Sequence, residues 1–174
     1  MTRITARTRA SCRSGQALVE FTLVGILLLL MVFGLVDFGR AILIRQILAG
    51  VSREGANLAS RGESLATTIT AVNASANPLN MTANGYVIVT AVRRAANGTL
   101  TVTGQQKAGG VVKTSSVGNA VGGAATLPAT AVEVPPRNRT LYVVEVFHRY
   151  TPVTPIGMLL GAALPTTLRD VAYF

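Results

Sequence analysis

Few side chains in this sequence could do chemistry, and the most unusual of them is the carboxylate of Glu20. It stands directly before an apolar stretch, Phe21 to Val36, that contains no charged residue. A carboxylate at the centre of a bilayer costs about 2.5 kcal/mol or more, but one near the headgroups costs far less. Glu20 is therefore either a residue of the membrane boundary or a charge with a function. The two interpretations are about equally favoured by this feature alone.

The residues that usually carry catalysis or bind metals are scarce. His148 is the only histidine and Cys12 the only cysteine, so a catalytic triad or a site with two histidines cannot form, nor can an intramolecular disulfide. Glu145 lies three residues before His148, on the opposite face of the expected strand. The pairs Gly109-Gly110 and Gly122-Gly123 lack the Lys-Ser or Lys-Thr of a phosphate loop and read as flexible linker. We expect the chain to be no enzyme and to bind no metal and no cofactor, and we expect His148 to be structural or exposed.

The composition indicates a membrane protein. Of the 174 residues, 49% are hydrophobic and 13% are charged, whereas soluble domains have about 25% charged residues. The apolar residues concentrate between Ala17 and Val36, a length that spans the roughly 30 Å hydrocarbon core as a helix. We expect one transmembrane helix.

The distribution of positive charge predicts the orientation of this helix. The net charge is +9, and four arginines without an acid lie in the first thirteen residues: Arg3, Arg7, Arg9 and Arg13. Basic residues before a span keep the N-terminus in the cytoplasm, although Arg40 and Arg45 after it weaken the asymmetry. Aromatic residues are 5% of the chain and tryptophan is absent, so the charge does not indicate nucleic-acid binding.

The residues around the start of the span are a more specific signal. An ordinary secretory signal has a shorter apolar region with a small-residue cleavage site directly after it, and neither is present. Instead Gly15 is followed by Gln16-Ala17-Leu18-Val19 and then by Glu20-Phe21. This arrangement resembles the type III signal of type IV pilins and pseudopilins.

The resemblance extends along the first sixty residues. The stretch from Gly15 to Gly62 is similar to the TadE-like minor pseudopilins of tight-adherence (Flp, type IVb/IVc) pilus systems. It implies that a membrane-embedded prepilin peptidase cuts between Gly15 and Gln16 on the cytoplasmic side. It also implies that Glu20 and Phe21 serve assembly, with Glu20 neutralising the N-terminal amine of an adjacent subunit. The implied partners are the peptidase, other pseudopilins or the major Flp pilin, and the inner-membrane assembly platform.

Beyond the span, the pattern predicts that the helix continues. Apolar or small residues recur at alternating spacings of three and four from Ala41 to Val72, which is typical of an amphipathic helix. The proline of Asn77-Pro78 ends it, and Gly62 leaves a break open. We expect the distal half of this stripe to pack on the chain's own domain and the proximal half on neighbouring subunits.

The remaining chain favours strands. Residues 86–94 and 99–105 form a hairpin through Asn97-Gly98, a dipeptide that favours a type I′ turn. Residues 107–130, rich in Gly, Ala, Ser and Thr, read as a long loop. Residues 141–150 make a third strand that pairs with the hairpin, and 156–164 could form a short apolar helix.

The expected fold is α+β and pilin-like. A long N-terminal helix, first transmembrane and then periplasmic, precedes a small antiparallel sheet of about three to four strands. The expected segments are a basic leader (1–15), a transmembrane helix (16–37), its continuation (38–77) and a periplasmic β-rich domain (78–174).

The function that follows is that of a non-enzymatic pseudopilin or minor pilin in assembly of a tight-adherence pilus for surface attachment. We expect a single-pass protein of the bacterial inner membrane, with a cytoplasmic N-terminus, a periplasmic C-terminal domain and association with the pilus. The alternative is an unprocessed, signal-anchored envelope protein that binds another partner.

Overall fold

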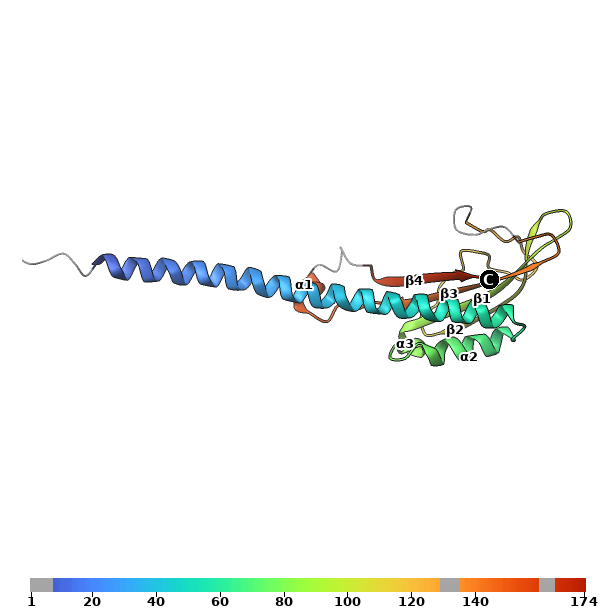
Figure 1. The fold of residues 1–174 in the computed structure, drawn as a ribbon, viewed down its shortest axis with the longest axis horizontal. Helices are drawn as coiled ribbons and strands as arrows, with labels where there is room; N and C mark the ends of the chain where they lie inside the picture. The colour runs from blue at the N-terminus through green and yellow to red at the C-terminus, as the bar shows by residue number, and fades with distance from the viewer. Residues whose placement is uncertain (1–7, 129–134, 160–164) are drawn as a thin grey trace, which may run out of the picture. The chain divides into compact units, whose positions relative to one another are not determined.

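In the computed structural model, a long helix precedes a four-stranded antiparallel sheet (Figure 1). The structure describes residues 8–128, 135–159 and 165–174. The helices are α1 (Thr8–Ser60), α2 (Leu65–Ser75), α3 (Met81–Asn84) and α4 (Pro155–Leu159). The strands are β1 (Gly85–Arg94), β2 (Leu100–Gly109), β3 (Thr140–Arg149) and β4 (Thr167–Tyr173), in the spatial order β2-β1-β3-β4. The expected α+β class, with a long N-terminal helix and a small antiparallel sheet, is confirmed.

The chain divides into two compact units, and helix α1 contributes to both. The first unit comprises Met1–Gly39 and Pro152–Leu164, and the second comprises Arg40–Thr151 and Pro165–Phe174. The expected apolar helix at 156–164 is α4 as far as Leu159, and the remainder of that range lies outside the described residues.

The helix after the apolar stretch is interrupted once, at the break near Gly62 that the sequence left open. Helix α1 ends at Ser60, and Gly62 has a φ of +96°, a left-handed conformation that is common after helix ends because glycine has no Cβ to clash. Ser64 then begins α2, its hydroxyl accepting a hydrogen bond from the Thr67 amide at 3.0 Å. The glycine stops one helix and the serine caps the next.

The distal part of α1 packs on its own domain, as the apolar stripe predicts. Leu48, Val51 and Ala59 are buried. A Cβ placed on Gly55 would lie 2.5 Å from Val72 Cγ2 in α2 and 3.4 Å from Val144 Cγ1 in β3. Gly55 is thus a point of close contact between α1 and α2.

The expected hairpin is present, but its turn is of a different type. Strands β1 and β2 pair antiparallel, with a register shift between Ala91 and Val92. A type I′ turn needs positive φ at both central residues, whereas Gly98 has a φ of +91° and Asn97 is not among the described residues with positive φ. The Asn97 side chain accepts a hydrogen bond from the Thr99 amide at 3.1 Å instead. The turn therefore belongs to a longer, five-residue loop.

The four strands agree with the expected three to four, but the fourth strand, β4, was not located in the sequence; it pairs with β3. Strand β1 is buried from Gly85 to Val92 without alternation, which means that both faces of the sheet are covered. One face carries α1 and α2. The other face is covered by residues 110–128, which we call the strap.

The sequence predicts a long loop over residues 107–130, but residues 107–109 belong to β2. The strap occupies most of the remainder and is tied to the sheet. Val117 is 1% exposed and packs in one apolar cluster with Val92, Leu141 and Val143. Thr101 and Ala124 form an isolated antiparallel bridge. Gly109 has a φ of +137°, and a Cβ there would collide with the carbonyl oxygen of Gly85. Gly109 therefore allows a close approach of the two chain segments.

Candidate functional site

The residues predicted to serve processing and assembly lie within seven positions of helix α1. Gly15, Gln16, Glu20 and Phe21 are all exposed. Around Gly15, a Cβ would meet no heavy atom within 4 Å. Phe21 is 79% exposed and belongs to a run of exposed apolar residues, and such contiguous apolar surface is typical of membrane or protein contacts. The local geometry leaves this segment open to a membrane or to protein partners.

The helix that carries these residues is a candidate membrane span by its length and composition. Its apolar window shows no burial within the chain, and leucines, isoleucines and valines are exposed all around it up to Val36. The Thr22 hydroxyl, inside this stretch, donates to the carbonyl oxygen of Leu18 at 2.8 Å. A polar group that bonds back to its own helix tolerates an apolar surrounding.

Asp37 follows the apolar stretch and is a polar residue whose role the sequence did not indicate. It is 2% exposed. Its carboxylate accepts hydrogen bonds from the Val153 amide at 2.9 Å and from the Thr154 hydroxyl at 2.5 Å. The same hydroxyl accepts a hydrogen bond from the Gly157 amide at 3.1 Å. Asp37 thereby fixes the segment that leads into α4.

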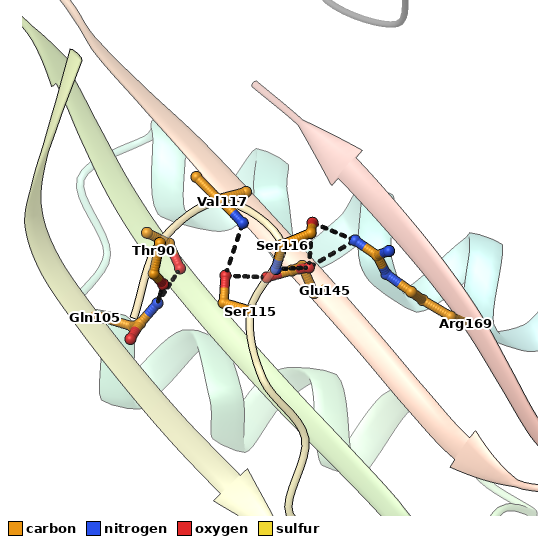
Figure 2. Close-up of polar contacts among 8 residues, drawn as sticks. Thr90, Gln105, Ser115, Ser116, Val117, Glu145 and Arg169 are labelled. Atoms are coloured by element: carbon orange, nitrogen blue, oxygen red, sulfur yellow. Dashed lines mark hydrogen bonds and ion pairs between the residues drawn. The ribbon is translucent and has the colours of Figure 1, made fainter. Parts of the chain in front are cut away.

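A second buried carboxylate, Glu145 in β3, holds the strap on the sheet (Figure 2). Glu145 is fully buried. Its Oε1 accepts hydrogen bonds from the Ser116 amide at 3.1 Å and the Ser116 hydroxyl at 2.8 Å, and the Ser115 hydroxyl donates to its Oε2. Arg169 in β4 completes the cluster with an ion pair of 2.7 Å. Nearby, Gln105 donates to Thr90 at 2.9 Å and to the Gly118 carbonyl at 2.7 Å.

The hydrogen bonds and the ion pair around Glu145 hold the fold together and do not form a reactive site. Both carboxylate oxygens are occupied and the group is shielded from solvent, so it offers no position for a substrate. Within the described part of the chain, no three His, Cys, Asp or Glu residues are grouped so that they could hold a metal ion. A glutamate among Val143, Val144 and Val146 indicates a buried carboxylate that needs a hydrogen-bond or ion-pair partner. The sequence alone does not identify the arginine and the serines that bind it.

Of the two expectations for His148, structural or exposed, exposure does not apply: the residue is buried, on the face of the sheet that carries the helices. It is 8% exposed, and burial lowers its pKa from 6.5. Its Nδ1 has no hydrogen-bond partner among the described residues. The ring lines a cavity of about 560 Å³ together with Arg40 and Arg149. Glu145 lies on the other face, as expected from its position in the strand.

One comparison with known proteins gives a match. The sequence model of the family described as TadE-like protein matches residues 15–57. The resemblance inferred from Gly15 to Gly62 is therefore confirmed over most of its length. No curated protein and no solved structure matches the chain.

Proposed function

We propose that this chain, whose residues 15–57 match the TadE-like family, is a pseudopilin or minor pilin that acts in assembly of a tight-adherence pilus for surface attachment. The family match relates the chain to this pilus system in general. The observation that supports the specific role is the apolar, exposed half of α1, which begins with Gly15 and a single carboxylate at Glu20. Such a helix can lie in a bilayer first and among other subunits later.

Processing is the first step of the proposal. Residues 1–15 are the basic leader and 16–37 the membrane helix, and a prepilin peptidase cuts between Gly15 and Gln16. The open surroundings of Gly15 are compatible with access by a protease. The cut releases the four leader arginines and creates a new amino group on Gln16, at the cytoplasmic end of the apolar helix.

Assembly is the second step, and Glu20 takes part in it. Gln16 and Glu20 are four residues apart, about 6 Å along a helix. In lipid an isolated carboxylate is unfavourable unless a cation accompanies it. Glu20 therefore pairs with the N-terminal amine of an adjacent pseudopilin or of the major Flp pilin, while Phe21 packs between the helices. The inner-membrane assembly platform is the place where these subunits meet, and the part of the chain beyond residue 37 is periplasmic.

The alternative is an unprocessed, signal-anchored envelope protein that binds another partner through its periplasmic domain. The two functions differ in the fate of Gly15. A processed subunit loses the leader and requires the peptidase, whereas a signal-anchored protein keeps Met1 in every strain.

A complementation experiment tests the proposed role in assembly. Deletion of the gene should abolish or strongly reduce piliation, and the full chain should restore it. A chain with Gly15→Val should insert in the membrane but fail to restore pili, whereas Gly50→Val, the same change at an exposed glycine of α1 outside the apolar stretch, should restore them. Normal piliation of the deletion strain would contradict the proposal.

A further inference from the structure

The cavity between α1, the loop before α3 and the end of β3 has the composition of an anion site. It is lined by two arginines, Arg40 and Arg149, by His148, and by the amides Asn80 and Asn84. None of the described residues that line it is acidic. Arg40 and Arg149 form no ion pair within the described residues; the ion pair present in that part of the chain joins Arg169 and Glu145, outside this cavity. Two guanidinium groups without a counterion attract a negatively charged ligand.

Further donors face this cavity. The Asn80 side-chain oxygen accepts hydrogen bonds from the Ala83 amide at 3.1 Å and the Thr82 hydroxyl at 2.8 Å, so its NH₂ group remains as a donor. His148 also lines the cavity, and an imidazole ring can donate a hydrogen bond to an anionic oxygen. The donors therefore come from α1, from the residue before α3 and from β3.

The other wall of the cavity is apolar. Leu43 and Ile47 lie one helical turn apart on the face of α1 that also carries Arg40, and Leu79 joins them. A ligand that combines a phosphate with a hydrocarbon part would satisfy both walls. In the sequence Arg40 comes four residues after Val36, the last residue of the apolar stretch, and arginines so close to the end of a span reach the headgroup level.

We propose that this cavity binds the phosphodiester headgroup of an anionic phospholipid of the outer leaflet of the inner membrane. The guanidinium groups of Arg40 and Arg149 hold the phosphate oxygens, His148 and Asn80 donate to them, and Leu43 and Ile47 contact the glycerol and the first acyl carbons. The assignment to a lipid rests on the proposed function, which places the helix before Arg40 in the membrane. The assignment of an anion site rests on the residues that line the cavity.

His148 provides a direct readout, because it is the only histidine in the chain. Its charged surroundings are Arg40, Arg149 and, on the same face of the sheet, Asp170, whose carboxylate accepts a hydrogen bond from the Ser52 hydroxyl at 2.5 Å. A phosphate bound between the arginines would favour the protonated imidazole. Binding should therefore shift the imidazole resonances and raise the pKa of His148.

The experiment is a nuclear magnetic resonance titration of the full chain, labelled at histidine and held in a nonionic detergent. Dihexanoyl phosphatidylglycerol should shift the His148 signals in a saturable way. Arg40→Gln and Arg149→Gln should each weaken this binding about tenfold or more, because each removes charge-assisted hydrogen bonds. Arg53→Gln, which removes an exposed arginine of α1 outside the cavity, should leave it unchanged.

Three outcomes would overturn the proposal. An absence of shifts would mean that the cavity is no anion site. Equal shifts with dihexanoyl phosphatidylcholine, which has no net charge, would exclude recognition by charge. Equal affinity for inorganic phosphate would exclude the lipid as the source. The titration uses purified protein and does not depend on processing or piliation. The lipid site can therefore be refuted without refuting the role in pilus assembly, and the role in pilus assembly can be refuted without refuting the lipid site.

Discussion

At the scale of single residues, the surroundings of Glu20 differ from those of two other carboxylates in the chain. Glu20 is exposed in the apolar half of α1. No basic side chain among the described residues forms an ion pair with it. Glu145 and Asp37 are buried and bonded to hydroxyl and amide donors. A buried carboxylate needs such donors, because a buried polar group left without them costs free energy, whereas an exposed one at the head of an apolar helix can form contacts with another molecule.

Glu20→Gln keeps the shape of the side chain and removes its charge. Under the proposed function it should leave membrane insertion and processing nearly normal but reduce piliation and co-purification with pilus components. Glu20→Asp, which keeps the charge on a shorter side chain, should retain a larger part of the piliation. Electron microscopy and pull-down from a deletion strain measure both. If the Gln variant gave wild-type pili, Glu20 would be only a residue of the membrane boundary.

Glu145→Gln tests whether the buried carboxylate and its ion pair with Arg169 stabilise the domain. Hydrogen bonds to charged groups contribute about 1.5–3 kcal/mol each, so the loss of the charge opposite Arg169 should lower the free energy of unfolding by about 2 kcal/mol. The chain has four tyrosines and no tryptophan, so tyrosine fluorescence can follow urea unfolding in nonionic detergent. Glu54→Gln, an exposed glutamate of α1, is the control and should change stability by less than about 0.5 kcal/mol. Equal midpoints for both variants would show that the ion pair contributes nothing.

The predictability of these residues from the sequence was uneven for a physical reason. The span, Gly15 and Glu20 form a local pattern, readable from neighbours in the chain. The partners of Glu145 lie in the strap and in β4, so the pairing depends on how distant segments are brought together. Asp37 likewise depends on Thr154, far along the chain.

At the scale of elements, the contact between α1 and α2 depends on a glycine. Glycine in a helix interior costs about 1 kcal/mol relative to alanine, so Gly55→Ala would stabilise an isolated helix. Here the new Cβ would lie 2.5 Å from Val72 Cγ2, a buried side chain. Gly55→Ala should therefore lower the free energy of unfolding by about 1–3 kcal/mol, as overpacked cores do.

Gly50 offers a matched control in the same helix, because a Cβ there meets no heavy atom within 4 Å. Gly50→Ala should leave stability unchanged or raise it by up to about 1 kcal/mol. Urea unfolding of the two variants, followed by tyrosine fluorescence, gives the comparison. A stabilising Gly55→Ala would contradict the close contact of the two helices.

Elements with a strong periodic pattern were predictable, and those defined by packing were not. The apolar helix, the hairpin of β1 and β2 and strand β3 followed from periodicity. Strand β4, with Arg169 and Asp170 in its middle, has no simple alternation because its polar residues bind Glu145 and Ser52. The strap has a composition typical of loops, and its order comes from contacts with the sheet.

At the scale of the whole molecule, the proposed topology places the sheet in the periplasm. A cysteine at Ser115 would be a poor reporter, since that residue is 7% exposed and bonded to Glu145. Val112 is 83% exposed. Val112→Cys in a Cys12→Ser background should react with an impermeant thiol reagent while the inner membrane is intact.

The native Cys12 provides the opposite control. In a chain with Gly15→Val, where the leader should be retained, Cys12 should react only after the inner membrane is lysed. Labelling of the cysteine at position 112 only after lysis would reverse the proposed orientation.

The central claim is that the chain is a processed pilus subunit, and the N-terminus of the protein isolated from membranes tests it most directly. N-terminal sequencing and intact mass in cells that have the prepilin peptidase should give a chain that begins at Gln16. Cells without the peptidase, and cells with the Gly15→Val variant, should give a chain that retains the leader. A chain that retains Met1 in peptidase-positive cells would contradict the account and favour the signal-anchored alternative.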